Sequence, residues 1–170
     1  MARRLSVRLR SRLALAFALS LLGLQSVAPT PPAMAGLVLI LGLHLLGYLW
    51  VRLAVAGLRV TRERREEPTY TGDPFAERLT IRSRALVPLL WGELRDASAL
   101  PGYPGSAVIA LAPRAETTVA LSGHALRRGV YALGPVTLIM GDPFGLFEAR
   151  LRFDAGARRV VYPRPRELPP

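Results

Sequence analysis

The sequence predicts a two-helix transmembrane hairpin followed by an all-β antiparallel sandwich, and two observations carry this prediction. Residues 13–28 and 33–51 form two almost wholly apolar runs. From residue 66 the chain consists of short alternating runs separated by Pro, Gly, Asp and Ser, which is typical of antiparallel sheets with one buried face. We therefore expect a membrane hairpin with basic flanks over 1–65, a β-domain over 66–163, and a proline-rich connector or truncated end over 164–170.

The two apolar runs have the properties of membrane helices. At about 1.5 Å per residue, the first run crosses most of a bilayer core and the second is longer. The second run ends in Tyr48 and Trp50, whose amphipathic rings favour the membrane–water interface. Pro29, Pro31 and Pro32 separate the runs, and because proline cannot continue a helix the chain must turn there.

The net charge of +11 is concentrated beside the apolar runs. The connecting loop carries no charge, so the positive-inside rule places both ends of the hairpin, and the β-domain, in the cytoplasm. Arginines at these margins meet anionic headgroups, which argues against a nucleic-acid patch. The margin arginines are Arg3, Arg4, Arg8, Arg10, Arg12, Arg59, Arg62, Arg64 and Arg65.

Three features of the hairpin leave alternatives open. Residues 13–35 also fit a secretory signal that ends in an Ala33-Met-Ala35 cleavage site, although the remaining span would still keep the β-domain cytoplasmic. His44 fits either a neutral ring that donates to a backbone carbonyl or a proton relay or metal ligand. Gly36, Gly42 and Gly47 allow helices to approach closely.

Alternation defines the strands of the β-domain. Apolar residues at every second position of 147–154 share one face, and Leu79 and Ile81 alternate with polar neighbours in the same way. With runs at 86–94, 107–111, 117–121, 130–133, 136–140 and 159–162, the count reaches about eight strands, which favours a two-sheet sandwich. We expect Trp91 to anchor the core and the Tyr131 hydroxyl to bind a turn.

No residue pattern supports catalysis or a cofactor. The chain has no cysteine, which excludes disulfides and thiolate chemistry. Ser122 and His124 lie two apart on a predicted strand, a spacing that suits no nucleophile–base pair, and neither a metal set nor a phosphate-binding loop is present. Asp142 fits an Asx turn better than a metal ligand or a general base. We expect no enzyme activity within this sequence.

The segments RGVYALGP and DPFGLF, followed by VVYPR, resemble the bacterial domain-of-unknown-function 58 family. The resemblance implies an immunoglobulin-like sandwich behind a multi-pass hairpin in the bacterial inner membrane, and a partner of the MoxR-type AAA+ ATPase class. It also implies that the chain is the N-terminal portion of a longer protein, or a truncated or split member. The residues of the motif are Arg128, Gly129, Tyr131, Gly134, Pro135, Asp142, Pro143, Phe144, Gly145, Leu146 and Phe147.

These features predict a membrane-anchored adaptor that works with such an ATPase in protein assembly or maturation. Two alternatives belong to other classes. The first is the anchoring part of a membrane peptidase or transglutaminase-related enzyme whose catalytic region lies beyond residue 170. The second is a sensor whose sandwich binds a ligand, or a peptide by strand addition.

Overall fold

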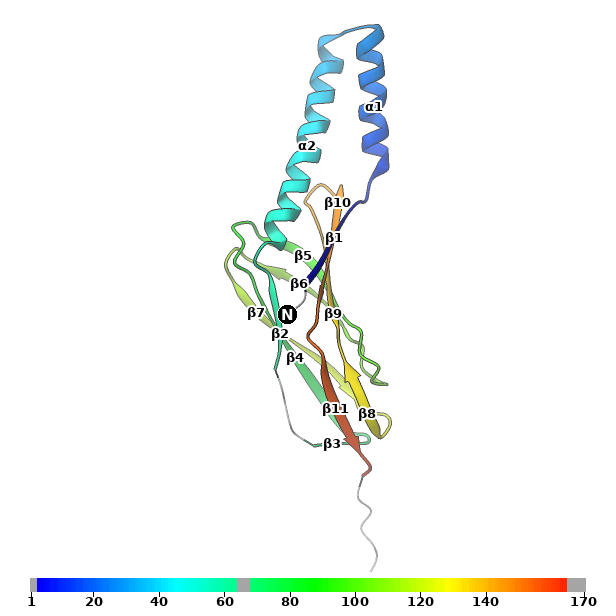
Figure 1. Cartoon of the computed structure of the whole chain (residues 1–170), viewed down its shortest axis with the longest axis vertical. Coiled ribbons are helices and arrows are strands. Elements are labelled where there is room, and N and C mark those ends of the chain that lie inside the picture. Colours follow the sequence, from blue (N-terminus) through cyan, green and yellow to red (C-terminus); the bar gives the residue numbers. More distant parts are fainter. Residues whose placement is uncertain (1–2, 64–67, 165–170) are drawn as a thin grey trace, which may run out of the picture.

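The protein is an elongated molecule with a helical hairpin at one end and a β-sandwich below it (Figure 1). This computed structural model describes residues 3–63 and 68–164, without the side chain of Arg3. The helices are α1 (Arg12–Val27) and α2 (Pro31–Val55). Eleven strands lie in the described residues: β1 (Arg3–Leu9), β2 (Arg59–Arg62), β3 (Thr69–Tyr70), β4 (Pro74–Arg82), β5 (Leu89–Asp96), β6 (Ser106–Leu111), β7 (Glu116–His124), β8 (Gly129–Leu133), β9 (Val136–Gly141), β10 (Phe147–Phe153) and β11 (Ala157–Tyr162).

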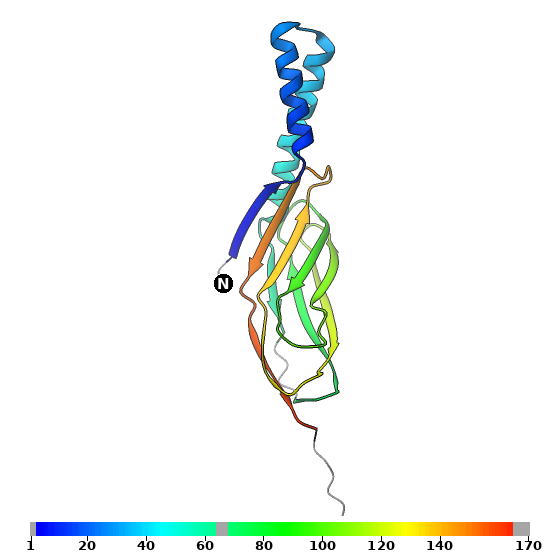
Figure 2. The same ribbon diagram turned by 90° about the vertical axis from the view of Figure 1, so that its right-hand side faces the viewer.

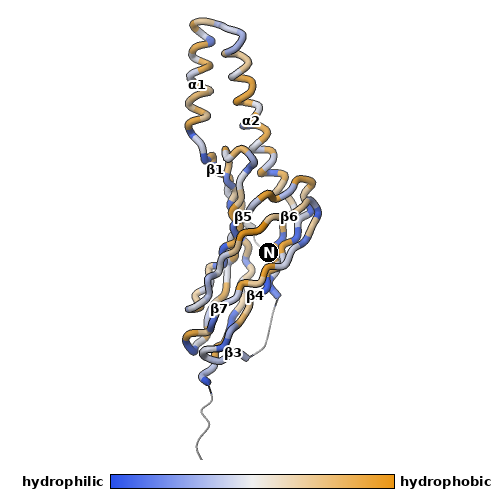
Figure 3. Tube along the Cα trace, turned by 180° about the vertical axis from the view of Figure 1, so that it is seen from behind, coloured by the Kyte–Doolittle hydropathy of each residue, from blue (hydrophilic) through white to orange (hydrophobic). Residues whose placement is uncertain are grey.

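The two helices pack side by side as an antiparallel pair (Figures 1 and 2). Pro31 begins α2, where the missing N–H of proline costs nothing because the first helical turn lacks acceptors. A Cβ on Gly36 would lie 3.3 Å from Leu21 of α1, so this glycine permits the close approach. Within the described residues, α2 alone is long and apolar enough to cross a membrane by length and composition, while α1 is apolar but shorter. Both helices are apolar along most of their length (Figure 3).

The sandwich contains one five-stranded sheet and two three-stranded sheets. The five-stranded sheet has the order β1-β10-β9-β5-β6, and the smaller sheets have the orders β2-β4-β7 and β3-β11-β8. The main core lies between the five-stranded sheet and the β2-β4-β7 sheet, where Leu79, Ile81, Leu138 and Leu151 are fully buried. A smaller apolar cluster around Phe75 lies at the end of the sandwich far from the hairpin, which we name the far end.

Two strands of the sandwich precede the range 66–163 predicted for the β-domain. β1 pairs with β10 from Arg3↔Phe153 to Leu9↔Phe147, and β2 pairs with β4. The domain boundary expected near residue 66 is therefore wrong, because residues on both sides of the hairpin complete the sheets. Strands of one sandwich lead into α1 and out of α2.

The alternation of apolar residues located most of the other strands. The inward faces predicted for β10 and for Leu79 and Ile81 of β4 are confirmed. The predicted core position of Trp91 is wrong, because its side chain is 40% exposed. A bulge between Leu89 and Gly92 turns those two residues inward and leaves Leu90 and Trp91 outside.

The last turns of α2 belong to the core of the sandwich. Val51, Ala54 and Val55 are each at most 2% exposed and cluster with residues of both main sheets. Leu58 and Val60 continue the same buried row into β2. The helix is therefore packed into the domain and is not linked to it by a free segment.

Candidate functional site

The turn between β9 and β10, Asp142 to Phe147, is organised by the carboxylate of Asp142. One carboxylate oxygen accepts the N–H of Phe144 at 2.8 Å, and the other accepts the N–H of Phe147 at 2.5 Å. The N–H of Gly145 donates to the Asp142 carbonyl oxygen at 3.3 Å, and its φ of +70° favours glycine. Asp142 is 3% exposed and serves as an Asx-type turn residue, as the sequence predicts.

The same turn packs against α2, and we name this contact the hairpin joint. A Cβ on Gly47 would lie 3.1 Å from an Asp142 carboxylate oxygen, which is tighter than an ordinary contact, so glycine favours this close approach of the turn. The Phe147 ring meets the rings of His44 and Tyr48 edge-on, with centroids 6.2 and 5.8 Å apart. The DPFGLF half of the motif therefore fixes the orientation of the helix on the sandwich.

His44 has a structural place within the hairpin joint. Its Nδ1 donates to the carbonyl oxygen of Ile40 at 2.8 Å, which agrees with the expected bond from this ring to a backbone carbonyl. Among the described residues, its Nε2 has no hydrogen-bond partner. The part of the chain described here holds no group of three His, Asp or Glu residues that could bind an ion.

The RGVYALGP half of the motif lies away from the hairpin joint. The Tyr131 hydroxyl donates to the carbonyl oxygens of Arg127 and Arg128 at 3.0 and 3.4 Å, so the predicted bond between this hydroxyl and a turn is confirmed. The ring covers Gly129, where a Cβ would lie 3.3 Å away. Gly134 has a φ of +79° and forms a cis peptide bond with Pro135.

A network of buried charges connects the strands of the sandwich. One Glu77 oxygen contacts Arg159 Nε at 2.8 Å and Nη2 at 2.6 Å, and its other oxygen accepts from Arg62 Nη1 at 3.1 Å. Arg62 Nη2 also donates to Asp96 at 2.6 Å. All four side chains are at most 9% exposed. Two positive and two negative charges therefore compensate one another away from water.

Polar groups around Asp96 complete this network. The Tyr103 hydroxyl donates to Asp96 Oδ2 at 2.9 Å, while Ser98 and the N–H of Gly134 donate to Oδ1 at 2.7 and 2.9 Å. Burial, together with the charge of Asp96 and the hydrogen bond to it, raises the pKa of Tyr103. Burial alone would lower the pKa of Arg62, but the hydrogen bonds and charges of Asp96 and Glu77 raise it.

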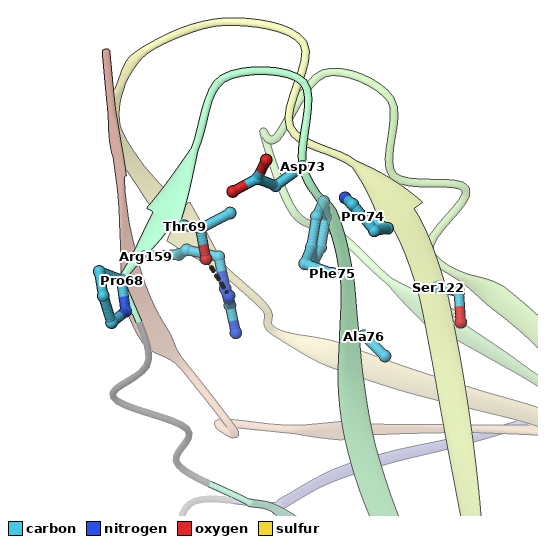
Figure 4. Close-up of a pocket in the computed structure, with 8 residues that line it drawn as sticks. All are labelled: Pro68, Thr69, Asp73, Pro74, Phe75, Ala76, Ser122 and Arg159. Carbon is cyan, nitrogen blue, oxygen red and sulfur yellow. Dashed lines mark hydrogen bonds between the residues drawn. The ribbon is translucent and has the colours of Figure 1, made fainter. Parts of the chain in front are cut away.

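A cavity of about 340 Å³ lies at the far end, beside the network (Figure 4). Its walls include Arg159, Asp73, Phe75 and Ser122. The guanidinium of Arg159 lies over the Phe75 ring, 5.2 Å from its centroid, and donates to the Thr69 hydroxyl at 2.8 Å. Because Glu77 neutralises Arg159, the cavity offers polar contacts without a free positive charge.

The structure distributes the predicted margin arginines among three environments. The prediction is wrong for Arg62, whose side chain is 4% exposed within the buried network. Arg4, Arg8 and Arg59 are exposed on strands β1 and β2, whereas Arg10 and Arg12 are exposed at the start of α1. Arg64 and Arg65, and the side chain of Arg3, lie outside the described residues.

Sequence reasoning missed the charge network altogether. Glu77 lies on the inward face of β4, between the buried residues Phe75 and Leu79. An acidic residue at such a position indicates a buried partner of opposite charge. Arg159 occupies the corresponding inward position beside Val161 on β11. Ser122 and His124 are exposed on β7.

Comparison with known proteins gives structural neighbours alone. No family model and no curated protein matches the chain. It is similar to the crystal structure of the CARDB domain of a Pyrococcus furiosus protein in complex with di-metal ions, with a TM-score of 0.46, 10% identity, and coverage of 63% of this chain and 94% of that chain. Red sea bream transglutaminase gives a TM-score of 0.42 and 21% identity, and the match covers 62% of this chain and 15% of that chain.

Proposed function

We propose that the chain is a membrane-anchored, non-catalytic adaptor that presents the far end of its sandwich to a cytoplasmic protein partner. The observation that carries the proposal is the way in which the hairpin joins the sandwich. β1 leads into α1 and α2 leads into β2, and both strands belong to one domain. A hairpin that enters a bilayer from this domain must return to the same side of the membrane.

The surfaces of the helices support insertion into lipid. The two helices expose many large apolar side chains, and an apolar surface of this size is unfavourable in water and suits hydrocarbon. Arg10, Arg12 and Arg52 flank the hairpin at the end near the sandwich, so the positive-inside rule favours a cytoplasmic sandwich. The exposed apolar side chains include Leu13, Phe17, Leu19, Leu22, Val38, Leu39, Leu41, Leu45 and Leu46.

The far end offers a surface that suits a protein partner. Val130 of β8 and Val160 of β11 lie directly opposite each other and are 66% and 41% exposed. Tyr162 follows on the same face, and the centroid of its ring lies 6.2 Å from that of the Tyr70 ring. β8 is also the edge of its sheet, and the loop after β5 binds part of its outer side, where the Ala99 N–H donates to the Ala132 carbonyl oxygen at 3.2 Å. The motif resemblance supplies the proposed partner class, a MoxR-type AAA+ ATPase.

The orientation is tested with single cysteines, which the chain allows because it has none of its own. We expect Leu126→Cys, in the exposed loop after β7, to react with a membrane-impermeant maleimide in inverted vesicles and to be protected in intact spheroplasts. Reaction in intact spheroplasts would place the sandwich outside the cell and refute the proposed orientation.

The partnership is tested by affinity purification of the full chain from detergent-solubilised membranes. We expect a MoxR-type ATPase to be retained by the wild-type chain and lost with Val160→Arg. The matched control is Val108→Arg on β6, where the wild-type side chain is 78% exposed. Failure of the wild-type chain to retain the ATPase, or equal loss with both variants, would contradict the proposed partner or the proposed surface.

A further inference from the structure

The β9–β10 turn reaches beyond the end of α2 and runs alongside that helix. Both side views place it beside the base of the hairpin, where α1 begins (Figures 1 and 2). Its contacts on α2 are His44, Gly47 and Tyr48, whereas α2 ends at Val55. Gly47 precedes Val55 by about 12 Å of helix, given a rise of 1.5 Å per residue. The turn therefore lies at a level that apolar helix surface also occupies.

The outward side of this turn is uncharged. Pro143, Phe144 and Gly145 are exposed, and the Phe144 ring is 43% exposed even though it belongs to an otherwise well-packed loop. Along the sequence, the nearest charged residues are Asp142, which is buried against Gly47, and Glu148, which pairs with Arg150 at 2.7 Å. The tip of the turn thus presents an apolar surface.

The backbone of the turn is also prepared for a medium with little water. The Asp142 carboxylate accepts the N–H groups of Phe144 and Phe147, and the Asp142 carbonyl oxygen accepts that of Gly145. Pro143 has no N–H to satisfy. Because unsatisfied backbone groups are costly in lipid, this internal pairing of three N–H groups lowers the cost of placing an irregular loop at a bilayer surface.

The lengths of the helices put the turn near the boundary of the hydrocarbon. The helix from Pro31 to Tyr48 is about 26 Å long, close to the roughly 30 Å of a bilayer core. An arginine and a tryptophan, which are typical of the headgroup layer, lie next to the turn. The Arg10 N–H donates to the Leu146 carbonyl oxygen at 2.7 Å, and a Cβ on Gly141 would lie 3.1 Å from the Trp91 ring.

We infer that the β9–β10 turn is a lipid-contacting wedge, whose Pro143 and Phe144 enter the boundary between headgroups and acyl chains beside the hairpin. The inference rests on the proposed membrane anchoring. It adds a third contact with the bilayer to the two helices, and this contact fixes the tilt of the sandwich on the membrane. Exposed Trp91 lies at the headgroup level in the same arrangement.

The test uses single cysteines that carry an environment-sensitive fluorophore, in the full chain reconstituted into vesicles of phosphatidylcholine and phosphatidylglycerol. Two further sets of vesicles contain phosphatidylcholine with a nitroxide near the headgroup end or near the middle of one acyl chain. The labelled positions are Phe144→Cys and Pro143→Cys in the turn, Leu41→Cys on the exposed side of α2, and Leu126→Cys at the far end. Two turn positions are included so that the result does not depend on one variant.

We expect the fluorophores at Phe144 and Pro143 to shift their emission to the blue and to lose fluorescence to the nitroxide, as the Leu41 probe does, while the Leu126 probe does neither. If the Leu41 probe is quenched but the turn probes show neither a blue shift nor quenching, the proposed wedge is wrong and the proposed membrane anchoring stands. If the Leu41 probe also escapes quenching, the hairpin is not in the bilayer, and both proposals are wrong.

Discussion

The buried charge network predicts a large cost for removing the charge of one glutamate. Glu77→Gln keeps the size of the side chain but removes the negative charge that two guanidinium groups share. Arg159 contacts Glu77 at 2.6 and 2.8 Å, and Arg62 contacts it at 3.1 Å. Arg62 keeps Asp96 as a partner, whereas Arg159 loses the carboxylate that two of its nitrogens contact.

The expected loss follows from the burial of these groups. The side chains of Arg159 and Glu77 are 9% and 4% exposed, so water screens the pair very little. Breaking a buried ion pair by removing one partner costs about 3–5 kcal/mol, a large part of a total stability of roughly 5–15 kcal/mol. For a chain of this size, the loss corresponds to a decrease in Tm of roughly 6–20 °C.

The measurement is thermal unfolding of the full chain in detergent, followed by circular dichroism in the β-sheet region. The matched control is Glu116→Gln, which removes an exposed glutamate 3.7 Å from Arg82, with side chains 52% and 61% exposed. Exposed pairs contribute about 0–1 kcal/mol, so this variant should unfold close to the wild-type temperature.

A second variant separates the lost charge balance from damage to packing. If an uncompensated arginine causes the loss, Glu77→Gln with Arg159→Met should be more stable than Glu77→Gln alone, because the orphaned charge is gone. A Glu77→Gln variant as stable as Glu116→Gln would refute the reasoning, since the network would then contribute nothing to the fold.

Three further predictions concern other parts of the molecule. Burial raises the pKa of Tyr103, so above pH about 10 the unfolded chain loses a proton that the folded chain retains, and stability falls as pH rises. Tyr103→Phe should make this alkaline decline in denaturant midpoints shallower, and an unchanged slope would contradict the assignment. Gly47→Leu should destabilise the hairpin joint by about 1–3 kcal/mol through overpacking against Asp142, whereas Gly42→Leu, where a Cβ meets nothing within 4 Å, should not lower Tm. Val7→Asp should lower Tm by burying a carboxylate against the main core, and equal Tm values for this variant and Arg8→Ala on the exposed face would show that β1 is not part of the stable sheet.

Local patterns in the sequence were sufficient for much of the fold. Alternation located β10 and the inward face of β4, because a period of two places every second side chain in the core. The Asx turn at Asp142 and the hydroxyl contact of Tyr131 also follow from short-range chemistry within a few residues. Such features need no knowledge of distant strands.

The features that were missed depend on long-range pairing. The sequence predicts Arg62 at the membrane margin because it lies in a basic run. Only the pairing of β2 with β4 brings it to Glu77. The size of Trp91 predicts a core position, yet one extra residue in β5 turns its side chain outward. A bulge leaves no trace in a hydrophobic pattern, so its position could not be predicted.

β1 also bears on the interpretation of residues 13–35 as a cleaved signal. Cleavage after Ala35 would remove β1 together with α1 and leave the whole edge of β10, from Phe147 to Phe153, without its partner. It would also remove Leu5 and Val7, which pack against the main core, and an unpaired edge strand promotes aggregation. A sandwich that uses the residues before its first helix as a strand favours retention of that helix. The mass of the mature chain measures this directly, and a mature N-terminus at Gly36 would show that the paired edge is dispensable.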